Sequence, residues 1–205
     1  MAQRSLPLTV ADNAALGRFT SLLDRAAWFT PLPRSVPAGT TTKDLLTVPA
    51  KDAQSLLRNV VRLVADLPTG TTPVVVWQQG AAELEVDTAS VRIRCEEGLV
   101  TLGVIVSCDQ LDAPTLIEVP LAVGTAEAPT GLVMSTVNRL QGPQVVTGAW
   151  SDAITAFAWE ALLEVARRIC EALGQDSARR AIVPGGIAAA RGALLIQPMA
   201  RPDRG

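Results

Sequence analysis

The sequence predicts an α+β protein, in which an antiparallel β-meander of six or seven strands packs against two or three helices. Two observations predict this class. Between residues 72 and 150, apolar and polar side chains alternate in short segments with a period of two, which is typical of half-buried strands. The segments 49–67 and 151–173 instead repeat apolar residues every three or four positions, which is typical of helices with one buried face.

Residues 1–42 are predicted to form an arm outside the main domain. The segment 12–29 has the apolar spacing of a helix and ends in Trp28 and Phe29. The thirteen residues that follow contain three prolines and one glycine, which disfavour both a helix and an interior strand. We therefore expect a single α+β domain with a C-terminal tail over 43–205, and we treat Trp28 and Phe29 as candidate anchors for a partner.

The two helices of the main domain are each predicted from an apolar stripe. The stripe of the first consists of Ala53, Leu56, Leu57, Val60, Val64 and Leu67. The stripe of the second consists of Ile154, Ala158, Ala161, Leu162, Val165, Ile169 and Leu173. On the polar side of the second helix, Glu164 and Arg168, and likewise Arg167 and Glu171, are spaced for ion pairs between successive turns.

Seven segments with a period of two are predicted as strands. They are 73–77, 82–86, 91–95, 99–107, 115–123, 131–137 and 145–150. Because they are short and lie close together with no helical pattern between them, we expect antiparallel pairing. After the second helix, a further strand is predicted at 193–197, and the glycine-containing segment 183–192 is predicted to make a turn.

The segment 82–95, AELEVDTASVRIRC, has the pattern that most resembles a site. It contains three acidic side chains at alternate positions and then two arginines at alternate positions. A four-residue hairpin loop at 87–90 would place Glu85 opposite Arg92. It would likewise place Glu83 opposite Arg94. Such exposed pairs contribute roughly 0.2–1 kcal/mol each. We therefore interpret the charges as a solvated structural ladder.

The strand predicted at 99–107 is apolar on both faces. A tight turn before it would place Gly103 opposite Arg92 and leave room for the long side chain. Leu99 and Ile105 then point to the same side as the arginines. Another part of the chain or another subunit is expected to cover that side, so Leu99 and Ile105 are candidate interface residues.

The composition argues against several chemistries. The 205 residues contain no histidine, which excludes Ser-His-Asp and Cys-His nucleophilic sites and zinc sites that use imidazole. Cys95, Cys108 and Cys170 are odd in number and widely spaced, which favours a reducing, cytoplasmic compartment over a disulfide framework. The net charge of −2 favours neither a nucleic acid nor a membrane surface as a partner. We expect no signal peptide, membrane span, metal or cofactor.

The sequence favours a non-catalytic protein that associates with itself or with a protein partner, such as an assembly factor, an adaptor or a component of a larger complex. The two-faced strand, the proline-rich arm and a hydrophobic content of 48% with only 3% aromatic residues motivate this interpretation. The alternative is a small-ligand-binding protein or an enzyme that uses carboxylates and arginines with a divalent metal or an anionic ligand. Its candidate residues are Asp87, Arg92, Asp109 and Asp112.

Overall fold

The computed structural model describes most of the chain after the predicted arm. The described residues are 45–65, 67, 70–129, 139–173, 179 and 181–200. The predicted arm 1–42, with Trp28 and Phe29, lies outside them, as do the predicted strand 131–137 and the last five residues. The boundary between the arm and the domain therefore stays a prediction.

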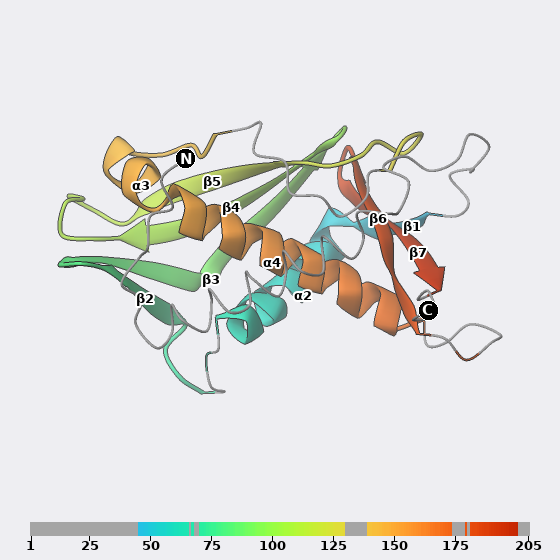
Figure 1. Cartoon of the computed structure of the whole chain (residues 1–205), viewed down its shortest axis with the longest axis horizontal. Helices are drawn as coiled ribbons and strands as arrows, with labels where there is room; N and C mark the ends of the chain where they lie inside the picture. Colours follow the sequence, from blue (N-terminus) through green and yellow to red (C-terminus); the bar gives the residue numbers. More distant parts are fainter. Residues whose placement is uncertain are drawn as a thin grey trace.

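The described residues form an α+β fold of antiparallel strands and helices, as the sequence predicts (Figure 1). The seven strands that these residues contain are divided between two sheets. The four-stranded sheet consists, in spatial order, of β2 (Val74–Gln79), β3 (Ala82–Glu96), β4 (Leu99–Ser107) and β5 (Thr115–Ala122). The three-stranded sheet consists, in spatial order, of β1 (Leu46–Pro49), β7 (Ala193–Ala200) and β6 (Ile182–Ala190). The four-stranded sheet is a meander, since its spatial order is its sequence order.

Two long helices lie on the same side of the four-stranded sheet (Figure 1). The helices of the described residues are α2 (Ala50–Val64), α3 (Gln144–Ala149) and α4 (Ser151–Glu171). The predicted stripes face the core; the buried residues are Ala53, Leu57, Val60, Val61 and Val64 of α2 and Ile154, Ala158, Trp159, Ala161, Leu162, Val165, Ala166 and Cys170 of α4. Leu56, Leu67 and Ile169 are half-buried, and Leu173, beyond the end of α4, is exposed. None of these described helices is both long and apolar enough to cross a membrane.

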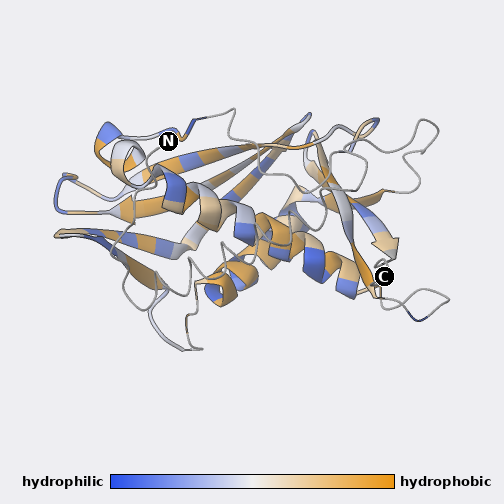
Figure 2. Ribbon diagram, in the orientation of Figure 1, coloured by the Kyte–Doolittle hydropathy of each residue, from blue (hydrophilic) through white to orange (hydrophobic). Residues whose placement is uncertain are grey.

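The inner face of the four-stranded sheet, which α2 and α4 cover, is apolar. β4 contributes Val100, Leu102, Val104 and Val106, and β5 contributes Ile117, Val119 and Leu121. Hydrophobic and hydrophilic bands alternate most clearly along β3 (Figure 2), as expected when one face packs on the core. The predicted strand 99–107 is confirmed, and that at 115–123 ends one residue earlier than predicted.

The predicted hairpin at 87–90 is wrong, because β3 continues through these residues without a turn. Asp87 pairs with Ile105 and Arg92 pairs with Gly103, so four residues of β3 lie against one residue of β4. Buried positions of β3 change from even-numbered to odd-numbered residues at this point. A hairpin and a bulge both produce that change, and the chain forms the bulge. The predicted pairing of Gly103 with Arg92 is confirmed.

Side chains within the bulge bind backbone groups that the strand ladder leaves unpaired. Asp87 Oδ1 accepts a hydrogen bond from the Ala89 amide at 2.9 Å. Ser90 Oγ donates to the Asp87 carbonyl at 2.6 Å and accepts from the Ile105 amide at 2.7 Å. Asp and Ser close tight turns by the same kind of bond, which explains why the residues predict a turn.

Gln54 of α2 covers the edge of β3 beyond the end of β2. Its Nε2 donates to the Val91 carbonyl at 2.7 Å, and its Oε1 accepts from the Ile93 amide at 2.8 Å. One side chain thus satisfies a backbone acceptor and a backbone donor that an additional strand would otherwise pair. The contact ties α2 to β3 directly after the bulge.

The predicted strand at 145–150 is wrong, because most of this segment belongs to α3. The Pro143 carbonyl accepts hydrogen bonds from the amides of Val146 and Thr147, each at 3.0 Å. Proline suits the position before a first helical turn, since it has no amide to leave unpaired. The β-branched residues favour a strand, but Val146 alone among the residues of α3 is buried, so local hydrogen bonds decide the conformation.

The predicted turn at 183–192 is also wrong, because β6 occupies most of the segment and its last two residues alone make the turn. Small side chains here permit close approach. A β-carbon at Gly185 would lie 2.8 Å from the Met199 sulfur, and Ala189 is fully buried. Glycine and alanine in this segment therefore serve packing within a sheet. The predicted strand 193–197 is confirmed within β7.

The two sheets meet at the turn between β3 and β4. The Gly98 amide donates to the Ala189 carbonyl, and the Gly192 amide donates to the Cys95 carbonyl, each at 3.0 Å. These bonds join the end of the four-stranded sheet to the β6–β7 hairpin. The opposite end of β3, which carries Glu83, Glu85 and Asp87, lies away from the second sheet (Figure 1).

Candidate functional site

The face of the four-stranded sheet that is turned away from α2 and α4, here called the outer face, contains four of the residues that the sequence singles out. Outer residues alternate with core-facing residues along each strand, and all but three of them are half-buried or exposed. They are Val74, Val76 and Gln78 of β2; Glu83, Glu85, Asp87, Arg92, Arg94 and Glu96 of β3; Leu99, Thr101, Gly103, Ile105 and Ser107 of β4; and Leu116, Glu118, Pro120 and Ala122 of β5.

The strand registers arrange the outer face in rows that cross the strands. The central row is Val74–Asp87–Ile105–Leu116. On one side of it lies the row Val76–Glu85–Ser107. On the other side lies the row Arg92–Gly103–Glu118. The central row therefore separates the acidic half of β3 from the half that contains its arginines.

The central row and its neighbour Val76 leave apolar side chains in contact with solvent. Leu116 is 37% exposed and Val76 is 39% exposed, whereas the inner residues of β4 are at most 5% exposed. Ile105, Val74 and Leu99 are half-buried. Covering such apolar surface contributes about 25 cal/mol per Å², so a partner placed here would gain hydrophobic stabilisation.

Arg94 is held by two carboxylates of the outer face. Its Nε lies 3.2 Å from Glu96 Oε1, and its Nη1 lies 3.1 Å from Glu118 Oε1. Because β4 separates β3 from β5, the Arg94–Glu118 pair passes over β4. The sequence predicts room for an arginine at Gly103, but Leu116 fills part of that room, since its Cδ1 would lie 3.2 Å from a β-carbon at Gly103.

The predicted ladder of acid–arginine pairs does not form, because its acids and its arginines lie on one continuous strand. Glu85 Oε2 accepts a hydrogen bond from Ser107 Oγ at 3.0 Å, and Glu83 accepts one from Gln78 Nε2. Arg92 is exposed, and no ion pair joins it to another described residue. The charged side chains do face solvent as predicted, and Arg92 is the one of the two outer arginines whose charge no described carboxylate pairs.

The carboxylates predicted as an alternative ligand site do not converge. Asp87 is engaged with the backbone of the bulge. Asp109 and Asp112 are exposed in the loop after β4, and Arg92 lies in the row on the far side of Asp87 from that loop. Across the part of the chain that the structure describes, no three His, Cys, Asp or Glu side chains are grouped as a metal site requires.

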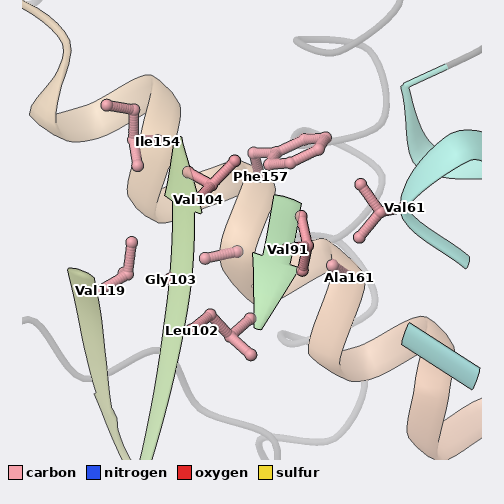
Figure 3. A pocket seen from close by; sticks show the side chains of 10 residues that line it. Val61, Val91, Leu102, Gly103, Val104, Val119, Ile154, Phe157 and Ala161 are labelled. Atoms are coloured by element: carbon pink, nitrogen blue, oxygen red, sulfur yellow. The ribbon is translucent and has the colours of Figure 1, made fainter. Parts of the chain in front are cut away.

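A small pocket lies between α2, α4 and the inner face of the sheet (Figure 3). Its lining is hydrocarbon: Val61, Val91, Leu102, Gly103, Val104, Val119, Ile154, Phe157, Ala158 and Ala161. Its volume of about 10 Å³ is close to the least that one water molecule needs. The pocket is a packing gap in the core and offers no polar group to a ligand.

Two of the three cysteines are held as unreactive thiols. Burial raises the pKa of Cys95 to about 11 and that of Cys170 to about 11, so thiolate is scarce at neutral pH. All three cysteines are free, and Cys108 is half-buried. Cys95 and Cys170 therefore act as small apolar residues of the core, as their positions in the sequence predict.

Comparisons of the chain with protein-family models, with curated proteins and with solved structures found no match. The outer face thus has to be interpreted from its own residues. The sequence indicates Leu99 and Ile105 of this face as candidate interface residues, but it does not indicate Val74, Val76 and Leu116. The signal for Leu116 is present in the segment 115–123, where it is the apolar residue out of phase with the buried positions.

Proposed function

We propose that this chain is a non-catalytic protein that associates with itself or with a protein partner through its outer face, as an assembly factor, an adaptor or a component of a larger complex. The observation that carries the proposal is the two-sided apolar character of β4. Its inner residues are buried under α2 and α4. On its outer side Ile105 is half-buried and lies beside the exposed Leu116.

The charges of the outer face favour a protein partner over a nucleic acid or a membrane. A surface that binds phosphate groups is rich in Lys and Arg and poor in carboxylates. The outer face instead combines Arg92 and Arg94 with several carboxylates, including Glu85 and Glu118. Mixed charges around an apolar centre are the arrangement common at protein–protein interfaces.

The proposed compartment is the cytoplasm. Cys95, Cys108 and Cys170 are all free thiols, and an odd number of unpaired cysteines suits a reducing environment. Cys108 is the half-buried member of the three, so it is the thiol that an oxidising compartment would expose to intermolecular pairing.

The proposal is tested by removing the apolar contact without disturbing the core. Ile105→Arg places a charge in the central row, and Leu63→Arg is the matched control because Leu63 is 51% exposed on α2, on the other side of the sheet. We expect wild-type protein and Leu63→Arg to show, by light scattering, a mass above the 21.5 kDa of one chain, or to retain the same co-purifying protein. Ile105→Arg should lose that mass or that protein while keeping its circular dichroism spectrum.

Two results would contradict the proposal. One is that the wild-type chain is strictly monomeric and that no protein co-purifies with it that is missing from the Ile105→Arg preparation. The other is an association that Leu63→Arg and Ile105→Arg weaken equally, because that would place the contact surface elsewhere.

A further inference from the structure

We propose that the partner of the outer face is a second copy of this chain, packed face to face across a twofold axis that runs along the central row Val74–Asp87–Ile105–Leu116. The inference rests on the proposed function, since it names the occupant of the same surface. It is carried by the distribution of charge along β3, which is its own complement about that row.

The symmetry follows from the geometry of face-to-face packing. Two copies related by a twofold axis can oppose the same face only when the axis lies in the plane of the interface. An axis along the central row is perpendicular to the strands, so it reverses the strand direction of the second copy. A residue of one copy that lies one row from the axis then faces a residue of the second copy that lies, in its own sheet, one row from the axis on the opposite side.

This operation places acids opposite arginines on β3. Glu85 is one row from the axis on one side and Arg92 is one row from it on the other. Glu85 of each copy therefore lies opposite Arg92 of the other, which gives two equivalent pairs. The next rows place Glu83 opposite Arg94 in the same way. Complementary charge of this kind selects the orientation of the two copies.

The same operation gathers the apolar side chains at the centre. Ile105, Leu116 and Val74 lie on the axis, so each meets its own copy. Ser107 of one copy meets Gly103 of the other, beside the side chain of Leu116. Asp87 is also on the axis, but its carboxylate is turned back to the Ala89 amide. An apolar centre with a charged rim is the usual anatomy of an interface.

Of the β3 charges that the operation opposes, Arg92 and Glu85 are available for a contact, whereas Arg94 is already paired with Glu96 and Glu118. No ion pair within the described chain engages Arg92, and Glu85 has a neutral hydrogen-bond partner, Ser107. A twofold axis along β4 would instead place Arg92 opposite Glu118 of the second copy. Glu118 is already engaged at 3.1 Å by Arg94, so the Arg92 contact of that orientation would compete with an existing pair. The Glu85–Arg92 contact nearest the central row displaces no ion pair of the described chain, and we favour the axis along that row.

The test exchanges charges between copies. Arg92→Glu alone gives two Glu–Glu contacts per dimer, and Glu85→Arg alone gives two Arg–Arg contacts. Each variant should dimerise at least about tenfold more weakly than wild type in sedimentation equilibrium. An equimolar mixture of the two variants should form a heterodimer of wild-type affinity, because both opposed pairs are then restored. The double variant should form its own homodimer but should not mix with wild type. Arg58→Glu, an exposed change of the same charge on α2, is the control and should have no effect.

Several outcomes would overturn this inference. The wild-type chain alone could have a mass of 21.5 kDa at every concentration and yet co-purify with a different protein that the Ile105→Arg variant does not bind. That result would exclude the second copy and leave the proposed function standing. A dimer that Ile105→Arg breaks but that both charge variants leave intact would exclude this axis. Rescue of Arg92→Glu by Glu118→Arg, and not by Glu85→Arg, would place the axis along β4.

Discussion

Leu116 and Leu121 are the same residue type on the same strand, five positions apart, and they face opposite sides of the sheet. Leu121 is fully buried under the helices, whereas Leu116 is 37% exposed on the outer face. The inner side of β5 is explained by folding, because burial of its apolar residues stabilises the domain. Apolar surface that stays in water contributes nothing to that stability, so folding does not explain the outer side, which the proposed second copy would cover.

The largest expected effect on the free energy of unfolding is the difference between alanine substitutions at these two leucines. Leu121→Ala should lower the free energy of unfolding by about 2–5 kcal/mol, since it leaves a cavity in the core. Leu116→Ala should change it by about 0.5 kcal/mol or less in dilute, monomeric protein. Urea unfolding of both variants measures the difference. Equal losses would mean that the outer face is packed within the chain itself.

A smaller effect is expected at Gln54, which joins the inner helix layer to β3. Gln54→Ala leaves the Val91 carbonyl and the Ile93 amide without their partner, and should cost about 1–3 kcal/mol of stability. Gln144→Ala, at an exposed position of α3, is the control and should stay near wild type. Faster hydrogen exchange of the Ile93 amide in Gln54→Ala would confirm the mechanism. Unchanged exchange would show that the bond does not protect this edge.

The smallest effect concerns the ion pairs of α4, which the sequence predicts correctly. Glu164 binds both Arg167 and Arg168. Burial raises the pKa of Glu164, but the hydrogen bonds and charges of the two arginines outweigh it and hold the pKa below its ordinary value of 4.5. A carboxyl whose pKa is lowered by folding adds stability above its unfolded pKa and loses it as the pH falls through the folded value.

Glu164→Gln should therefore be less stable than wild type by about 0.5 kcal/mol at pH 7, and the gap should close as the pH falls below about 4. Thermal unfolding across this range measures the gap. A difference that stays constant with pH would show that packing, and not charge, accounts for it. Glu171→Gln, at the exposed end of the same network, provides a weaker comparison.

The inner face is predictable from the sequence because hydrophobic burial imposes a period on it. The stripes of α2 and α4, the strands β4 and β5, and the pairing of Arg92 with Gly103 all follow from that period. The predictions fail where two different local structures would produce the same hydrophobic period. At residues 87–90 a hairpin and a bulge give the same change of phase, and the bonds of Asp87 and Ser90 to the backbone are compatible with both.

Long-range contacts decide the remaining failures. Gln54 lies 37 residues from Val91, and no local pattern in α2 reveals that its side chain covers the edge of β3. The small residues of β6 are indistinguishable from a turn until Met199 and the β3–β4 turn are seen beside them. The candidate site is predictable in part, because Ile105 is out of phase within an apolar strand. The sequence predicts, however, that the neighbouring acids and arginines neutralise one another within the chain.

Cross-linking at Ile105 measures most directly whether the outer face meets a copy of itself. The Ile105→Cys variant, in a Cys108→Ser background, places one accessible thiol in the central row, and packed sheets lie about 10 Å apart. A bismaleimide with a spacer of about that length should convert the variant to a covalent dimer at micromolar concentration, whereas Leu63→Cys in the same background should remain a single chain. Cross-linking of Ile105→Cys that is no greater than that of Leu63→Cys would contradict association through this face.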